Sequence, residues 1–344
     1  MNKKKISSDI QNNIKLNKMN GELLSKAKIS ECFHHNKSEC NGTIKKAHSI
    51  QRNGKLSLLE EKDENDNSVL YSFTNTKVED NKLTLKPIGK AIASTFNGFC
   101  DFHDNKVFSP IEDASFKNTD EQCFLYSYRA FAHTHHRKTE QIKAYSAKTD
   151  FKKAVGKNKI NDALIGSLIS YDENEVIRNK LNTIIDSERY DSLEYLVIEY
   201  PNFFPIAATS SITPKYSPKT NTLLNNHSDP NIPYEPIFFN LIPEKRGSVL
   251  IMSSFPEDKK SILYLDEFES LHDLKQKKIL TSLLIGTIEN TFISPFIYKK
   301  LTKNENETLM EELIKTNPLS GTEYKSHFIS KLNFFENRFI KNYT

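Results

Sequence analysis

CFHHNKSEC at residues 32–40 and ASTFNGFCDFHDNKVF at residues 93–108 determine how the N-terminal part of the chain is expected to fold. Three of the four cysteines lie in these pieces, and a histidine follows the third in a Cys-x-x-His spacing. Zinc is bound in a tetrahedron by four Cys or His side chains, and this spacing lets one turn present two of them. The sequence therefore predicts a structural zinc ion bound by Cys32, Cys40, Cys100 and His103. Four unrelated residues are the alternative, because free cysteine often serves as a small apolar core side chain.

Two further residues lie beside the predicted zinc ligands. KAHSIQ at residues 46–51 places His48 on a predicted strand, and Asp104 directly follows the second ligand pair, at the start of a helical pattern ending before Pro110. This order of strand, ligand pair and helix resembles the HNH, or ββα-metal, nuclease superfamily. The resemblance covers residues 29–117. It implies a zinc-bound treble-clef or ββα module in which His48 is the general base and Asp104 binds a catalytic magnesium or manganese ion.

Phosphodiester hydrolysis is the reaction that this resemblance implies. A neutral imidazole accepts a proton from the attacking water, and a hard cation held by carboxylate oxygen stabilises charge on the phosphoryl oxygens. Ala47 departs from the family pattern, in which an acidic residue or a histidine often precedes the catalytic histidine. The family's middle asparagine has no single match among Ser94, Thr95 and Asn97. A zinc module that binds nucleic acid or a protein partner without cleavage is the alternative.

Length and composition favour a folded protein of two domains. The chain has 344 residues, of which 37% are hydrophobic and 27% charged. Its net charge of +4 is mild and permits a nucleic-acid partner, with DNA expected rather than RNA. Four cysteines in so long a chain do not predict a disulfide framework. The sequence contains no apolar run of membrane-spanning length and no signal-peptide core, so we expect a cytoplasmic protein without a membrane partner. No sequence feature specifies an oligomeric state.

The first part of the chain divides into an extension and a module. Residues 1–28 read as a basic N-terminal extension, with three lysines near its start and isoleucines at helical spacing. Residues 29–117 form the expected zinc module. The long separation between His48 and Cys100 requires an insertion, in which we predict strands at 56–59, 69–73 and 82–85 and an acidic loop at 60–67.

A helical section is predicted for residues 118–192. Its first helix carries an apolar stripe that includes Phe124, Tyr128 and Phe131, and Cys123 beside this stripe is interpreted as a buried core cysteine. Further helices are expected at 160–170 and 173–191. The histidine-rich basic run after the stripe is interpreted as solvated side chains rather than a metal tract. Arg129 and three residues of this run, His133, Arg137 and Lys138, are the predicted nucleic-acid contacts outside the zinc module.

An α+β domain with an antiparallel sheet is predicted for residues 193–344, and the fold class of the whole chain is accordingly α+β. Strands are expected at 193–200, 204–212, 237–242 and 248–253, a long loop at 213–236, and helices at 271–290, 308–316 and 324–341. No Gly-rich phosphate loop, nucleophile elbow or paired-carboxylate motif appears in this sequence, so we expect this domain to sense or regulate rather than cleave. By analogy, a small nuclease module joined to such a domain indicates a bacterial defence or toxin-type effector.

Overall fold

The computed structural model describes residues 19, 21–79, 82–112, 114–147, 157–226, 229, 232–316 and 326–342. The predicted helical spacing of isoleucines near the N-terminus, and the three lysines before it, lie outside the described residues. No helix among those described is long and apolar enough to cross a membrane.

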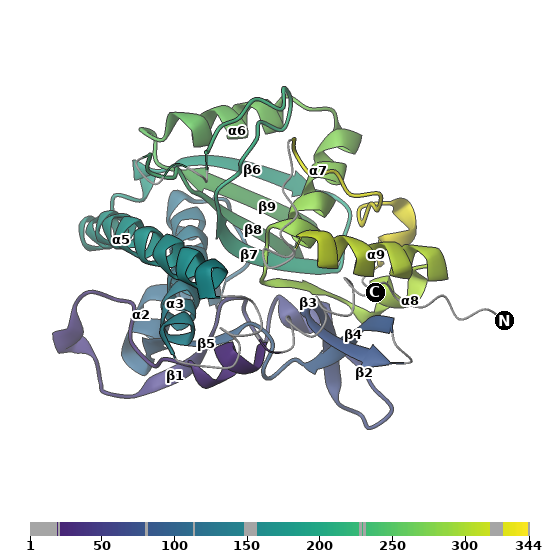
Figure 1. The fold of residues 1–344 in the computed structure, drawn as a ribbon, viewed down its shortest axis with the longest axis horizontal. Coiled ribbons are helices and arrows are strands. Elements are labelled where there is room, and N and C mark those ends of the chain that lie inside the picture. Colours follow the sequence, from purple (N-terminus) through teal and green to yellow (C-terminus); the bar gives the residue numbers. More distant parts are fainter. Residues whose placement is uncertain are drawn as a thin grey trace.

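A two-stranded sheet followed by a helix forms the N-terminal unit (Figure 1). Strand β1 (Ile44–His48) pairs antiparallel with β5 (Thr95–Cys100), so that His48 lies opposite Thr95. Helix α2 (Asp101–Glu112) begins directly after β5. The predicted strand at His48 and the helix after the second ligand pair are confirmed. The predicted helix end before Pro110 is wrong, because α2 continues through Pro110 to Glu112.

A second, eight-stranded antiparallel sheet forms the largest layer. Its strand order is β2-β3-β10-β7-β8-β9-β6, with β4 paired to β3. The strands are β2 (Glu61–Lys62), β3 (Ser68–Glu79), β4 (Lys82–Gly89), β6 (Glu194–Tyr200), β7 (Ile206–Ile212), β8 (Ile237–Glu244), β9 (Gly247–Ser254) and β10 (Thr291–Ile293). The antiparallel sheet is confirmed. Residues 56–58 form the 3₁₀ helix η2 (Leu56–Leu58) rather than a strand, and β10 was not predicted from the sequence.

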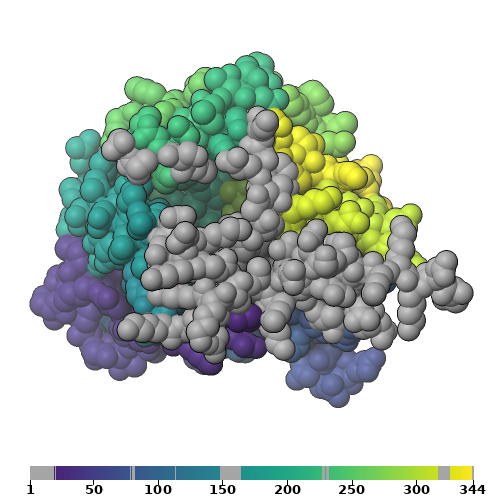
Figure 2. Space-filling view, viewed as in Figure 1, coloured from purple at the N-terminus to yellow at the C-terminus, as the bar shows by residue number. Residues whose placement is uncertain are grey.

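The insertion between His48 and Cys100 does not remain within the N-terminal unit. Strand β3 pairs with β10, with Ser72 opposite Phe292 and Tyr71 opposite Ile293. A strand edge exposes unpaired N–H and C=O groups, and β10 covers this edge of β3 at Tyr71 and Ser72. In the space-filling view the N-terminal unit appears at the lower left and the hairpin of β3 and β4 at the lower right (Figure 2). The expected segments 29–117 and 193–344 therefore share one sheet.

Helices cover both faces of this sheet (Figure 1). Helix α3 (Asp120–Ser146) packs across β7, β8 and β9, and α5 (Lys157–Ser187) packs on α3. On the other face lie α6 (Lys259–Glu269) and α7 (Asp273–Gly286), with α8 (Pro295–Lys300) and α9 (Lys303–Thr316) beside them. Successive residues of β8 point to opposite faces of the sheet and belong to two hydrophobic clusters. Phe238 belongs to the cluster that includes α3, and Phe239 to the cluster that includes α6 and α7. This double covering explains why β8 and β9 are buried almost throughout.

Several helix predictions need correction. The two helices expected between 160 and 191 are one continuous helix, α5, and α6 was not predicted. The helix expected at 324–341 is wrong over its described part, because residues 326–342 are irregular apart from the short η5 (Asn337–Phe339). Phe334, Phe335 and Phe339 in this segment are instead buried against the main core. The apolar residues of this segment have helical spacing, but they are buried in the main core as irregular chain.

Candidate metal centre and neighbouring polar site

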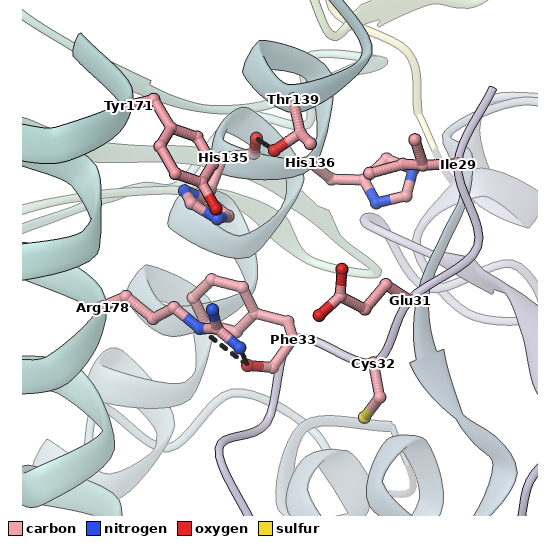
Figure 3. A pocket seen from close by; sticks show the side chains of 9 residues that line it. All are labelled: Ile29, Glu31, Cys32, Phe33, His135, His136, Thr139, Tyr171 and Arg178. Carbon is pink, nitrogen blue, oxygen red and sulfur yellow. Dashed lines mark hydrogen bonds between the residues drawn. The ribbon is translucent and has the colours of Figure 1, made fainter. Parts of the chain in front are cut away.

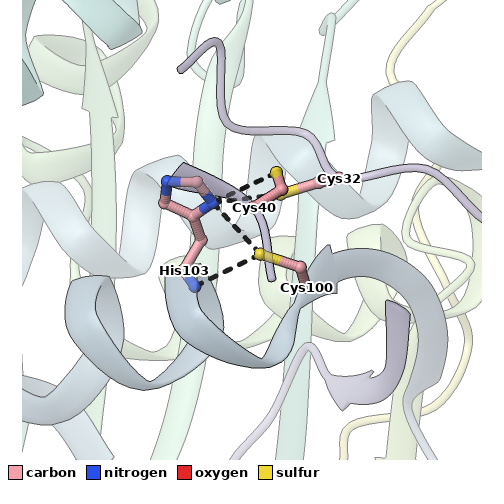
Figure 4. A group of neighbouring side chains, drawn as sticks. All are labelled: Cys32, Cys40, Cys100 and His103. Atoms are coloured by element: carbon pink, nitrogen blue, oxygen red, sulfur yellow. Dashed lines mark hydrogen bonds between the residues drawn. The ribbon is translucent and has the colours of Figure 1, made fainter. Parts of the chain in front are cut away.

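Four side chains converge at the start of α2. The ligand atoms of Cys32, Cys40, Cys100 and His103 all lie within 4.8 Å of one another. Figure 4 shows the three sulfurs around Nδ1 of His103, at 3.5, 3.6 and 3.2 Å respectively. A tetrahedron with Zn–S bonds of about 2.3 Å and a Zn–N bond of about 2.0 Å places sulfur and nitrogen about 3.5 Å apart. The predicted ligand set is therefore assembled with dimensions that can hold a metal ion such as zinc.

Each ligand comes from a differently constrained piece of chain. Cys32 lies in a segment held along β5, where the Phe33 N–H donates to the carbonyl oxygen of Gly98 at 2.6 Å. Cys40 follows the 3₁₀ helix η1 (Lys37–Glu39). Cys100 ends β5, and His103 lies in the first turn of α2. The backbone N–H of His103 donates to the Cys100 sulfur at 3.5 Å. Local spacing thus positions Cys100 and His103, pairing of the flanking residues with β5 positions Cys32, and the 3₁₀ turn positions Cys40.

The environment of His103 suits a metal ligand. Its Nε2 lies 3.6 Å from the Glu39 carboxylate, on the side away from the sulfurs, and His34 stacks on the ring at 4.0 Å. Metal-bound histidines commonly direct the second ring nitrogen at a carboxylate, which fixes ring orientation and tautomer. Burial lowers the pKa of His103, which favours the neutral form that can coordinate. Burial raises the pKa of the Cys40 thiol to about 12, so metal binding must release protons from this site.

Cys123 lies apart from this group. It is buried on α3, and its sulfur is 3.7 Å from Oδ1 of Asn118. Its interpretation as a core cysteine is confirmed.

His48 lies at the end of β1 and outside the metal group. Its Nδ1 is 2.9 Å from the carbonyl oxygen of Ala93 and 3.3 Å from Oγ of Ser94. A carbonyl oxygen only accepts hydrogen bonds, so the neutral ring carries its proton on Nδ1 and has a lone pair on Nε2. No residue in the described part of the chain hydrogen-bonds to Nε2. Burial lowers the pKa of His48, which keeps the ring neutral near pH 7.

The turn that holds His48 is itself unusual. Ser94 has a φ of 58°, a left-handed conformation that is uncommon for residues other than glycine. Its carbonyl oxygen accepts a hydrogen bond from the Ser49 N–H at 3.0 Å, and its hydroxyl donates to the carbonyl oxygen of Ile50 at 3.2 Å. Backbone outliers held in this way often occur at functional sites. No pattern in the residues around Ser94 predicts this turn.

Asp104 lies on the neighbouring first turn of α2 and is half-buried. Burial raises the pKa of its carboxyl group, and the nearby Arg129 guanidinium partly offsets that effect. Within the described residues nothing hydrogen-bonds to this carboxylate. His48 and Asp104 have two charged neighbours in common, Arg129 and Glu112, which act electrostatically on both. Glu112 was missed in the sequence because the helix was expected to end before it.

Arg129 is not the surface phosphate contact that the sequence indicated. The residue is 3% exposed, its Nη1 donates to Oε1 of Glu112 at 2.5 Å, and its guanidinium stacks 4.1 Å from the Phe108 ring centre. Figure 1 shows the reason: α3 lies between the N-terminal unit and the large sheet, so both of its sides are covered. Arg129 is therefore buried and paired rather than exposed, and nucleic-acid contact by it stays a prediction.

The remaining predicted contacts on α3 are partly buried. The His133 ring packs edge-on against Phe96 at 5.3 Å, and desolvation there lowers its pKa to about 3. Arg137 pairs with the buried carboxylate of Glu140. Burial lowers the pKa of Lys138. These three residues do not form the solvated basic face that the sequence favoured, and nucleic-acid contact by them stays a prediction.

Removal of the Glu112 charge is expected to destabilise the chain. Glu112→Gln leaves the Arg129 guanidinium buried without its counter-charge, and breaking such a pair should cost about 3 kcal/mol of unfolding free energy. The control is Glu257→Gln, which breaks the exposed pair with Lys180 and should cost at most about 1 kcal/mol. Urea unfolding of both variants measures the difference. Equal losses would show that the Arg129–Glu112 pair is not a stabilising element.

Comparisons of the chain with protein-family models, with curated proteins and with solved structures found no match. Its function is therefore inferred from the geometry of these residues.

Proposed function

We propose that the chain is a metal-dependent nuclease of the HNH, or ββα-metal, kind that hydrolyses phosphodiester bonds of nucleic acid, DNA in preference to RNA. The order of elements supports this proposal. One ligand pair, Cys32 and Cys40, precedes the β1–β5 pairing, and the other, Cys100 and His103, opens α2. We propose that this arrangement is a treble clef with a structural zinc ion, which would contribute folding free energy and not chemistry.

The observation that carries the proposal is the hydrogen bond from Nδ1–H of His48 to Ala93. It fixes the tautomer and leaves Nε2 as a base at the end of β1. In the proposed reaction, Nε2 accepts the proton of a water molecule as its oxygen attacks phosphorus. The P–O bond to one sugar oxygen breaks, and that oxygen leaves and takes a proton from solvent. Nδ1–H keeps its bond to Ala93 throughout. The lowered pKa of His48 keeps the base unprotonated at neutral pH.

Asp104 is the residue proposed to hold a magnesium or manganese ion. Its half-buried carboxylate offers the oxygen ligands that hard cations prefer. Such an ion would supply positive charge to the phosphoryl oxygens and the leaving group. The nearby Arg129–Glu112 pair carries no net charge, so Asp104 supplies the negative charge at this position.

Binding and cleavage by the full chain separate this proposal from its alternative. Labelled DNA and RNA fragments would be incubated with purified protein in the presence of magnesium, of manganese, or of EDTA for a short time. The zinc content of the protein would be measured afterwards. The nuclease proposal predicts shortened fragments with either metal and intact ones in EDTA. Shifted but intact fragments in every condition would instead support a zinc module that binds nucleic acid without cleaving. The absence of both effects, with zinc bound, would favour a protein partner.

Asp104→Asn is expected to weaken the response of cleavage to magnesium and manganese. The amide keeps the shape of the carboxylate and loses the charge that a hard cation prefers, so half-maximal activity should require about tenfold more metal ion. Asp101→Asn is the matched control, because Asp101 lies in the same helical turn but pairs with Lys45. A metal titration of cleavage rate for both variants gives the comparison. An unchanged titration for Asp104→Asn would remove Asp104 as a metal ligand.

We further propose that the large sheet and its helices sense a signal or regulate the nuclease unit. A bacterial defence or toxin-type effector combines such parts, and the shared pairing of β3 with β10 offers a physical connection between them. A fragment of residues 193–344 lacks β3 and would leave β10 without this neighbour. Regulation therefore has to be tested on the full chain.

A further inference from the structure

A small pocket lies between α3, α5 and the segment 29–33 (Figure 3). Its volume is about 40 Å³, and the side chains used below are Glu31, Phe33, His135, Tyr171 and Arg178. Cys32 also borders it, but none of the other lining residues belongs to the metal centre or to the proposed catalytic site. The space admits a group of a few heavy atoms and excludes an aromatic ring system.

His135 lines this pocket, and one of its ring nitrogens has no hydrogen-bond partner among the described residues. Its Nε2 lies 3.0 Å from Oε1 of Glu175, and a carboxylate accepts, so Nε2 carries the proton and Nδ1 has the lone pair. The residue is 6% exposed, and Nδ1 has no hydrogen-bond partner among the residues that the structure describes. Burial lowers the pKa of His135 to about 4, so the ring is neutral at pH 7. Buried acceptors are rarely left unpaired, and a ligand that donates a hydrogen bond would satisfy this one.

The charge of the pocket favours a cation. The Arg178 guanidinium already has partners within the protein. Its Nε and Nη2 donate to the Phe33 carbonyl oxygen at 3.0 and 2.8 Å, and its Nη1 pairs with Glu175 at 3.2 Å. Glu175 therefore offsets its charge. The carboxylate of Glu31 lies across the pocket from His135 (Figure 3). It forms an exposed ion pair with Lys37 at 3.3 Å, which water screens and a ligand can displace.

Aromatic rings form the remaining wall. Tyr171 stacks on His135 with ring centres 5.2 Å apart, and Phe33 meets the same imidazole edge-on at 5.5 Å. Cations are attracted to the faces of aromatic rings, most strongly where water is excluded. A neutral imidazole lone pair, a carboxylate and aromatic rings around a few heavy atoms of space are the chemistry of an ammonium site.

We propose that this pocket binds the terminal ammonium group of an alkylamine. One N–H donates to Nδ1 of His135, Glu31 offsets the charge, and the ring of Tyr171 contacts the ammonium and the adjacent methylene. Phe33 borders the space, with the Arg178 guanidinium over its ring at 5.1 Å. The amine is either a free polyamine or a lysine side chain of another protein, since both end in the same group. This inference does not depend on the proposed nuclease activity.

The test measures binding of defined amines to the full, zinc-loaded chain. Spermidine represents a free polyamine, Nα-acetyl-lysine N-methylamide represents a lysine side chain, and 1-butanol is the uncharged comparison. The NMR signals of the His135 ring would be followed up to about 20 mM probe, where a site of about 1 mM affinity is nearly saturated. A saturable shift with either amine and none with butanol is expected. The tighter of the two amines identifies the source.

Two variants locate the site. Glu31→Gln, on an exposed residue, should fold normally and bind the amine at least about tenfold more weakly, and Tyr171→Leu should weaken binding similarly by removing a ring. Asp172→Asn removes an exposed charge beside Tyr171 that does not line the pocket, and its affinity should match the wild type. No saturable shift with either amine, or equal affinity in Glu31→Gln and the wild type, would overturn the proposal.

Discussion

Cys100→Ser is expected to remove the metal ion and unfold the N-terminal unit. Serine is a poor ligand for zinc, and three ligands do not complete the tetrahedron. The binding free energy of a structural zinc ion, about 10–16 kcal/mol in small zinc-dependent peptides, is also folding free energy. The N-terminal unit depends on it strongly, because β1 and β5 form a sheet of two strands, which is marginally stable alone.

Zinc content and hydrogen exchange test this expectation. The wild type should contain one zinc ion per chain, and Cys100→Ser close to none. Amide protection should be lost over β1, β5 and α2, while β7, β8 and β9 retain theirs. Cys123→Ser is the matched control, since Cys123 is also buried but lies outside the ligand group. Cys100→Ser protein that keeps its zinc and its protection in β1 and β5 would contradict the proposed ligand set.

His48→Ala is expected to reduce cleavage by about 10²–10⁴-fold, the range typical for loss of a positioned general base. Zinc content should not change, because His48 is not among the four ligand residues. His272→Ala provides the control: His272 caps α7, far along the chain from the site, and its removal should leave cleavage intact. Single-turnover rates on a labelled duplex give the comparison. Wild-type rates in His48→Ala would exclude His48 as the base, and loss of zinc would reassign it to structure.

The pH dependence of the wild type follows from the same residue. The active form of His48 is neutral, and burial lowers its pKa below the usual value of about 6.5. Cleavage should therefore persist below pH 6.5 and fall only as the pH passes the lowered pKa. A profile whose acidic limb is centred above pH 6.5 would contradict this environment for the base.

The candidate metal centre could be predicted because two of its four ligand residues are close in sequence. Cys100 and His103 need only one turn, and Asp104 follows in the same turn. Cys32 and Cys40 could be added because free cysteines are scarce in this chain. The strand at His48 and the antiparallel strands after residue 193 followed from side-chain alternation and β-branched residues.

Long-range packing accounts for what the sequence did not show. Arg129 has the charge of a phosphate contact, and only the position of α3 between two layers reveals that Glu112 neutralises it. The pairing of β3 with β10 joins residues more than two hundred positions apart, which no periodicity indicates. The segment after residue 326 has helical apolar spacing, yet it packs as irregular chain because its phenylalanines fill the main core.

Cleavage of supercoiled plasmid by the zinc-loaded full chain tests the central claim most directly. In magnesium or manganese, the proposed nuclease should convert the plasmid to nicked and linear forms, and chelation of the added ion should stop the conversion. Plasmid that stays supercoiled through prolonged incubation with each ion, at protein concentrations in excess of DNA and with zinc verified in the protein, would contradict it.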